Sequence, residues 1–202
     1  SDNYIFSIPY FQRPYRFSAE LLKKLLSDLA DLLDSGGDSH FFGAIITNKV
    51  PGGMADPKQY QVIDGQQRIT TAYLIICGAV KALTAAKEKD AAKDIFEKYI
   101  VISGNTKSLS NIALHTGRSE RPALNKIVSD LNTAGDFKFN LTQLPALASS
   151  AEKGRLVQNY KLISTFFKKQ SETGGHERVS ALCESLLSGF RVIEINVTDP
   201  TD

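Results

Sequence analysis

The feature that most constrains the fold is a change of sequence pattern at residues 60–71, which read Tyr-Gln-Val-Ile-Asp-Gly-Gln-Gln-Arg-Ile-Thr-Thr. Residues 60–63 alternate and branch like a short buried strand, and Asp64-Gly65 is a typical turn sequence. From Ile69 onward the apolar residues recur at helical spacing. The sequence therefore predicts a strand that turns through a glycine directly into a helix.

Hydrogen-bond donors are concentrated in this predicted turn. The first backbone N–H groups of a helix have no partner within it, and the positive end of the helix dipole lies there. The donor side chains that follow the turn are Gln66, Gln67, Arg68, Thr70 and Thr71. Together with Gly65, they predict a phosphate-binding turn. The alternative is ordinary helix capping, although glutamine is a poor cap and the dipole repels an arginine at this end.

Asp64 is the carboxylate nearest to the predicted turn. It is a candidate for holding Mg²⁺ through water, for orienting Arg68, and for general-base chemistry. An alternative that stays open is a turn-forming role, in which the carboxylate bonds its own backbone.

A second candidate segment is formed by residues 10–17, Tyr-Phe-Gln-Arg-Pro-Tyr-Arg-Phe. Prolines at positions 9 and 14 exclude a helix here and favour an extended, rigid loop. In one interpretation the aromatic residues fill the core and the arginines lie in solvent. In the other, Gln12, Arg13 and Arg16 face an anion, with Tyr10 or Tyr15 stacked beside it.

The remaining pattern predicts an α+β fold. Strands are expected at residues 5–8, 41–48, 111–114 and 191–197, and the segment 41–48 is expected to pair with 60–63 across a turn at 51–57. Helices are expected from Ser18 to Gly36, from 69 through 99, after 118–122, and around 156–167 and 179–189. Gly43, inside a predicted strand, indicates close approach of another backbone or a ligand.

These elements suggest three parts. Residues 1–85 are expected to form an α+β lobe with the donor-rich motif, and residues 86–190 a helical lobe. Residues 191–202 are expected to contain a strand that rejoins the first sheet. Because the chain lacks an initiator Met and stops directly after this strand, we expect it to be a piece of a longer protein.

Composition excludes few classes of protein. Hydrophobic residues make up 42%, charged residues 23%, and the net charge is +2, which allows a polyanionic partner without requiring one. Cys77 and Cys183 lie in apolar helical stripes and are expected to be core residues. No apolar run reaches the length of a membrane span and no signal peptide is visible, so we expect a cytoplasmic protein without a membrane partner. The sequence contains no P-loop motif, no zinc-type histidine pair and no Gly-x-Ser-x-Gly motif.

Three segments, residues 8–17, 41–45 and 62–71, together resemble a known family. In order and spacing they are similar to the N-terminal domain of GmrSD-type, modification-dependent DNA restriction proteins, a bacterial family with an Asp-Gly-Gln-Gln-Arg signature, here residues 64–68. The resemblance is specific over residues 4–85 and general over 86–197. It implies a fold like those of ParB partition proteins and sulfiredoxin, with a small mixed sheet, helices, a mainly helical lobe and a returning strand.

The resemblance also implies an activity, namely binding and hydrolysis of nucleoside triphosphate coupled to phage defence by recognition or cleavage of modified DNA. The implied catalytic residues are Arg13, Asp64, Gln67 and Arg68. The implied nucleotide-binding residues are Gln12, Arg13, Gly65, Gln66, Gln67, Arg68, Thr70 and Thr71. DNA contacts are expected from Tyr10 and Arg16, with Mg²⁺ as cofactor and a C-terminal nuclease domain or partner subunit; homo-oligomerisation is left open.

Three functional hypotheses follow. The first is a triphosphate hydrolase that responds to DNA. The second is a regulatory module that binds nucleotide or DNA without hydrolysis. It is favoured by the shortage of general bases, because Asp64 is the only candidate in the motif. The third is a structural half-domain whose site is completed by a further segment.

Overall fold

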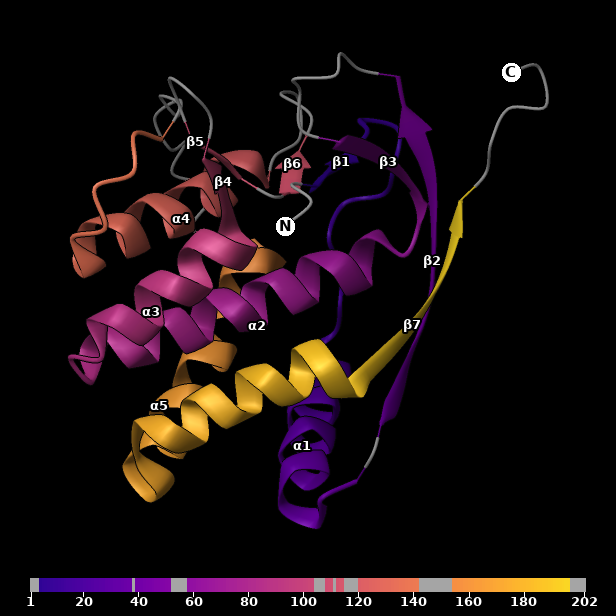
Figure 1. Cartoon of the computed structure of the whole chain (residues 1–202). Helices are drawn as coiled ribbons and strands as arrows, with labels where there is room; N and C mark the ends of the chain where they lie inside the picture. The colour runs from indigo at the N-terminus through magenta and orange to yellow at the C-terminus, as the bar shows by residue number, and fades with distance from the viewer. Residues whose placement is uncertain are drawn as a thin grey trace.

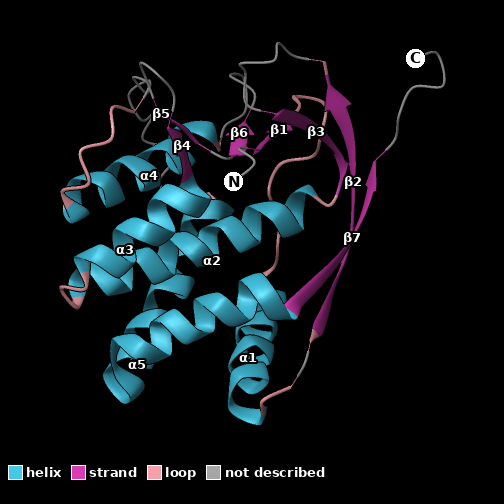
Figure 2. Cartoon of the chain, viewed as in Figure 1, coloured by secondary structure: helices cyan, strands magenta, loops and turns pink. Residues whose placement is uncertain are grey.

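The described part of the protein is a mixed β-sheet with its helices packed on one face (Figures 1 and 2). The computed structural model describes residues 4–37, 39–51, 58–103, 108–110, 112–114, 120–141 and 154–196. The strands are β1 (Tyr4–Ile8), β2 (His40–Val50), β3 (Lys58–Asp64), β4 (Val101–Ser103), β5 (Ser108–Ser110), β6 (Ile112–Leu114) and β7 (Phe190–Asn196). The helices are α1 (Ala19–Ser35), α2 (Gln66–Ala85), α3 (Lys89–Ile95), α4 (Arg121–Gly135) and α5 (Arg155–Glu184), with π-helical turns η1 (Phe96–Ile100) and η3 (Ser185–Gly189).

Within the described residues the main sheet has five strands in the order β6-β1-β3-β2-β7. The β2–β3 pair is antiparallel, which confirms the predicted hairpin, and the other pairs are parallel. Most of the turn predicted at 51–57 lies outside the described residues. The predicted α+β class and the returning strand are confirmed, since β7 pairs with β2 along residues 190–196. A separate pair, β4–β5, is a feature that the sequence pattern did not predict.

Helix α1 forms where the leucine pattern predicts it. The Ser18 side chain accepts a hydrogen bond from the Leu21 N–H, and Gly36 ends the helix at φ +63°. The residues that this helix buries are Leu22, Leu25, Leu26 and Leu29. Their 3-4 spacing places them on one face, which joins the hydrophobic core.

Helix α2 is the central helix of the core. Apolar side chains are buried around most of its circumference, among them Leu74, Ile75 and Val80 at 0% exposure. By length and composition alone α2 passes as a membrane-spanning helix, in contrast to the sequence-based expectation, but 67% of its 18-residue window is buried inside the protein. A core helix meets the same criteria. The helix ends at Ala85, and Lys87 at φ +67° separates it from α3, so the helical stretch predicted through residue 99 is interrupted.

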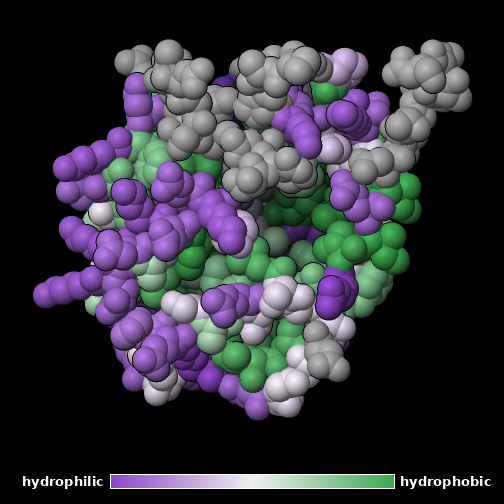
Figure 3. Space-filling view, in the orientation of Figure 1, coloured by the Kyte–Doolittle hydropathy of each residue, from purple (hydrophilic) through white to green (hydrophobic). Residues whose placement is uncertain are grey.

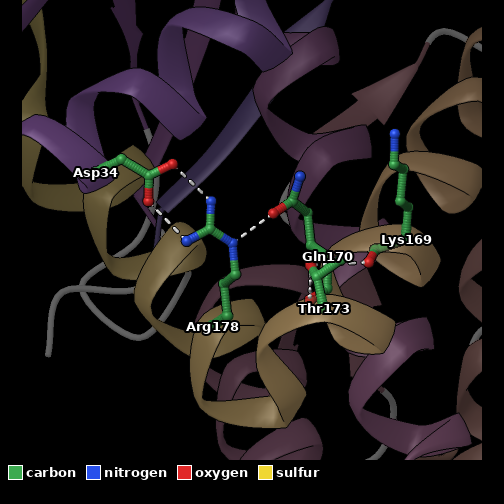
Figure 4. A network of polar contacts seen from close by, with 5 residues as sticks. All are labelled: Asp34, Lys169, Gln170, Thr173 and Arg178. Atoms are coloured by element: carbon green, nitrogen blue, oxygen red, sulfur yellow. Dashed lines mark hydrogen bonds and ion pairs between the residues drawn. The ribbon is translucent and has the colours of Figure 1, made fainter.

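Helix α5 is kinked at two adjacent glycines. Gly174 and Gly175 have non-helical backbone angles, with φ −133° and φ +68°. The two predicted helices around 156–167 and 179–189 are thus the two arms of α5, the second of which continues into η3. Figure 4 shows a polar network that braces the kink, in which Arg178 joins Gln170 on the first arm to Asp34 of α1.

Hydrophobic surface remains on the sheet side of the molecule. In Figure 3 it gathers over the side occupied by β2 and β7, opposite the hydrophilic surface over α3 and α4. The exposed apolar residues on β7 are Val192, Ile193 and Ile195.

On the face of the sheet that the helices cover, one hydrophobic cluster includes residues from both ranges 1–85 and 86–190. The division at residue 85 stays a prediction.

Candidate functional site: a basic cavity at the start of α2

The strand–glycine–helix turn predicted from residues 60–71 is present. Strand β3 ends at Asp64, Gly65 takes φ +93°, and α2 begins at Gln66, with the Ile69 N–H donating to Gly65 O at 3.0 Å. A Cβ at Gly65 would lie 2.9 Å from Ile45 Cγ1, so both the backbone angle and the space require glycine. No side chain caps this end of the helix among the described residues. The positive end of the α2 dipole therefore lies at the turn.

A cavity of about 630 Å³ lies between this turn and the loop of residues 12–17. Its volume is in the range of small-molecule sites. It is lined by Gln12, Arg13, Arg16, Phe17, Ser18, Leu21, Asp64, Gly65, Gln66, Gln67 and Arg68. Three arginines and one carboxylate give these walls a net positive charge. The structure thus brings together the two segments that the sequence marked separately, and the arrangement suits an anionic ligand.

Gln67 binds the loop of residues 12–17 with both ends of its amide. Its Nε2 donates to Pro14 O at 3.2 Å, and its Oε1 accepts from the Arg16 N–H at 2.8 Å. These two bonds fix the backbone of an otherwise extended segment next to α2. In the structure the Gln67 side chain therefore holds the loop, and its contact with phosphate stays a prediction.

Two further glutamines tie the same loop to the motif. Gln66 is 5% exposed, and its Nε2 donates to Arg13 O at 3.2 Å. Its Oε1 is buried without a hydrogen-bond partner among the described residues. Gln12 Nε2 donates to Ile63 O at 2.8 Å, near the end of β3. Loop and turn are consequently held as one unit from both sides.

Arg68 reaches the cavity wall by lying against a glycine of β2. Its Nη1 donates to Ala44 O at 2.9 Å. A Cβ at Gly43 would lie 2.5 Å from Arg68 Nε, and Gly43 has φ +118° next to a register shift in the β2–β7 pairing. A group does approach Gly43 closely, but it is the Arg68 side chain and not the backbone or ligand that was predicted. Since a guanidinium has five N–H groups, the bond to Ala44 leaves others to face a ligand.

A buried chain of hydrogen bonds supports the loop from behind. Asn159 Nδ2 lies 3.1 Å from the Tyr15 hydroxyl and 2.9 Å from Phe17 O, and the Tyr15 hydroxyl lies 2.9 Å from Thr71 Oγ1. Thr71 Oγ1 in turn donates to Gln67 O at 2.7 Å. Burial raises the pKa of Tyr15, and its hydrogen bonds with Thr71 and Asn159 oppose that rise. The phenol is neutral at physiological pH and acts as a structural group here.

Sequence reasoning missed two residues of this support, Asn159 and Glu120. Glu120 Oε1 accepts from the Tyr15 N–H at 2.6 Å. Asn159 carried a usable signal, because it lies three residues after Leu156, on the apolar stripe of the predicted helix, where a polar side chain needs a partner. Glu120 lies at the start of a predicted helix, a position at which an acidic residue is ordinary.

The other predicted site residues occupy different environments. Asp64 lies exposed at the end of β3 and lines the cavity. Thr70 and Thr71 are 4% and 0% exposed and are not among the lining residues. Tyr10 is 65% exposed, on the loop but outside the cavity lining. Their roles in ligand or DNA binding stay predictions.

Metal binding at this site would depend on a single protein carboxylate. Across the described ranges, no group of three or more His, Cys, Asp or Glu residues is placed to hold a metal ion. Mg²⁺ is commonly held by one or two carboxylates together with ligand phosphates and water. The cavity's one carboxylate, Asp64, fits that pattern when a phosphate ligand is bound.

Comparison with protein families gives a match over the whole chain. The family described as "GmrSD restriction endonuclease, N-terminal domain" matches residues 1–202. Comparison with curated proteins gives no match.

Proposed function

The chain belongs to the family of GmrSD restriction endonuclease N-terminal domains, and from this premise we propose that it binds and hydrolyses nucleoside triphosphate in the cavity at the start of α2. Hydrolysis would be coupled to recognition or cleavage of modified DNA by a nuclease domain or partner subunit. A cytoplasmic location is part of the proposal, because both substrates are found there.

The observation that carries the proposal is the charge of the cavity. Arg13, Arg16 and Arg68 line it, and it opens at the N-terminus of α2. Phosphoryl transfer is catalysed largely by positioning and by positive charge around the transferred group. Guanidinium groups suit this task, because their planar forks bind phosphate oxygens in pairs. In this proposal the glutamines of the turn hold the loop, and the arginines of the turn and of the loop face the ligand.

Asp64 is the acidic group of the proposed site. It is the carboxylate among the residues that line the cavity. Asp64 would hold Mg²⁺ through water, and the ion would neutralise phosphate charge when bound. Without that role, Asp64 is the candidate to orient or deprotonate the attacking water.

The proposal is tested by phosphate release from Arg68→Ala. Removing a guanidinium that stabilises the transferred group should lower turnover at least about 100-fold. Arg68→Lys keeps the charge but loses the fork, so it should remain well below wild type. The matched control is Arg191→Ala on β7, an exposed arginine outside the cavity lining. Wild-type turnover in a folded Arg68→Ala variant would overturn the proposed hydrolysis at this site.

The variant Gln67→Ala tests whether the Gln67 side chain holds the loop or takes part in the chemical step. Loss of the bonds to Pro14 O and the Arg16 N–H should loosen the loop. Because this disturbs ligand positioning more than the chemical step, KM should rise more than kcat falls. An equal loss of kcat and kcat/KM would instead assign Gln67 to the transition state.

The alternative function is a module that binds nucleotide without hydrolysing it. Its support is that the Gln66 and Gln67 side chains hold the loop and are not free to position an attacking water. Asp64 is then the single candidate general base among the residues that line the cavity. A calorimetric titration with nucleotide, followed by phosphate release over a long incubation, distinguishes the two. Binding without release selects the module.

A DNA contact is proposed for residues 10–16, at the rim of the cavity that Arg16 lines. Tyr10 is 65% exposed, and Arg16 is exposed near it in sequence. An aromatic ring can stack on a base, and an arginine can contact a phosphate. Affinity for DNA should fall with rising salt, and Arg16→Ala should reduce the slope of that dependence by about one unit. Salt dependence unchanged in this variant would remove Arg16 from the DNA contact.

A further inference from the structure

Asn159 is a fully buried amide on a helix face that is otherwise apolar. It is 0% exposed, and its neighbours along the same stripe of α5, Leu156 and Ile163, are buried hydrophobic residues. Burying an amide is costly unless its polar atoms find partners. Its Nδ2 donates two bonds, to Tyr15 and Phe17, in a segment more than 140 residues away in sequence, whereas its Oδ1 is buried without a hydrogen-bond partner among the described residues. The donor side of the amide is therefore the part that ties α5 to the loop.

The hydrogen bonds from Asn159 to the motif run in one direction. The Thr71 hydroxyl has a single hydrogen, and it is donated to Gln67 O at 2.7 Å. The contact of 2.9 Å between Tyr15 and Thr71 must therefore be donated by the Tyr15 hydroxyl. Tyr15 oxygen then accepts from Asn159 Nδ2 at 3.1 Å. Bonds aligned in this way polarise and strengthen one another, so the start of the chain at Asn159 affects every bond that follows.

Asn159 and Gln67 grip the loop at alternate positions. Gln67 holds the carbonyl of Pro14 and the N–H of Arg16, while Asn159 holds the hydroxyl of Tyr15 and the carbonyl of Phe17. Residues 14–17 are thus fixed by two helices, α2 and α5, that lie far apart in the sequence.

From this arrangement we infer that Asn159 is a positioning residue for the candidate nucleotide site, an inference that rests on the proposed function. By fixing the residues on either side of Arg16, it sets the backbone position from which the side chains of Arg16 and the neighbouring Arg13, which both line the cavity, start. Long cationic side chains reach a phosphate productively only from a defined backbone position. Asn159 itself does not line the cavity, so it acts through the loop.

Tryptic cleavage after Arg16 measures the hold on the loop directly. The Arg16–Phe17 bond lies between the backbone groups held by Gln67 and by Asn159, and the Arg13–Pro14 bond resists trypsin because proline follows the arginine. Asn159→Leu keeps the size of the side chain but removes both donors. Since cleavage follows the population of the opened loop, it should accelerate about tenfold after Arg16, with other sites unchanged.

The control is Asn132→Leu on α4. Asn132 is likewise a helical asparagine whose amide binds a loop, with Nδ2 donating to Phe139 O at 3.0 Å, but that loop does not line the cavity. Its cleavage after Arg16 should match the wild type. Tyr15→Phe is the milder variant, because it removes the hydroxyl and keeps the bond from Asn159 to Phe17 O. Its cleavage after Arg16 should be faster than in the wild type but slower than expected for Asn159→Leu. It takes the place of Asn159→Leu if that variant fails to fold.

Calorimetric titration of the same variants with nucleoside triphosphate then tests the positioning role. Faster cleavage together with about tenfold weaker binding in Asn159→Leu supports the inference. Unchanged cleavage, or faster cleavage with wild-type affinity, overturns it. If the wild type binds no nucleotide, the proposed function fails and the positioning role fails with it, yet faster cleavage would still assign Asn159 to holding the loop.

Discussion

Gly43 controls whether Arg68 can lie at the cavity wall. A Cβ there would lie 2.5 Å from Arg68 Nε and 2.9 Å from Cζ, and the backbone angle of φ +118° is one that other residues rarely adopt. The glycine thus serves the site although it does not line the cavity. A substitution of Gly43 is expected to affect ligand binding by moving the Arg68 guanidinium.

Gly43→Ala is predicted to displace Arg68. The backbone strain should cost about 1–3 kcal/mol of stability, measured by urea unfolding, and nucleotide affinity should fall at least about tenfold because a guanidinium moves. Gly36→Ala is the matched control, since Gly36 also has a positive φ, +63°, but a Cβ added there would meet no atom within 4 Å. It should lose stability and keep affinity. Equal affinities in both variants would contradict the role given to Gly43.

At the scale of elements, a charged contact joins the second arm of the kinked helix α5 to α1. Arg178 donates to both carboxylate oxygens of Asp34 on α1, at 2.7 and 2.8 Å, and to Gln170 across the kink (Figure 4). The hydrogen bonds from Arg178 hold the pKa of Asp34 below its usual range, and the pKa of Arg178 is raised by the same contact. The charge-assisted contact of Arg178 with both Asp34 oxygens therefore requires an ionised carboxylate.

The contact should make stability depend on acid pH. The folded-state pKa of Asp34 is depressed, so the stabilisation is complete above the unfolded pKa, about 3.9 in short peptides, and is lost as the pH falls through the folded pKa. Asp34→Asn should lower the urea midpoint at pH 7, and the difference from wild type should shrink below about pH 4. Asp31→Asn, an exposed position on the same helix, is the control. A difference that stays constant down to about pH 3 would contradict this account.

For the whole molecule, the question is whether the two predicted lobes unfold together. Cys77 of α2 and Cys183 of α5 are free and buried, and they belong to one hydrophobic cluster. Burial raises the pKa of both thiols, that of Cys183 to about 12. Reaction of either thiol with a reagent therefore requires unfolding of the segment around it.

The two thiols are predicted to become reactive over the same range of urea concentration. A shared core favours a single cooperative transition. The measurement is labelling at increasing urea, with Cys77→Ala and Cys183→Ala each reporting the remaining thiol. Transitions at clearly separate urea concentrations would show that residues 1–85 and 86–190 unfold as independent units.

Local sequence patterns predicted most of the fold. The leucine stripe with Ser18 and Gly36 and the strand–glycine–helix turn at Gly65 depend on neighbours within a few residues, and both formed. The β2–β3 hairpin joins two strands that follow each other in the sequence, and it formed as well. The pattern missed what local spacing does not encode. The break at Lys87 occurs within an Ala- and Lys-rich stretch of high helix propensity, and the pairing of β4 with β5 depends on contact between short segments.

The sequence by itself determined the turn at residues 64–68 and the presence of a charged, proline-containing loop, because backbone angles and spacing are local properties. Only the tertiary structure decided the partners of those side chains. It directed the amides of Gln66 and Gln67 to the loop backbone and placed Asn159 behind Tyr15. The physical reason is that a buried polar group bonds to whatever the packing of distant segments brings within reach, and such distances are set by the folded core rather than by separation along the chain.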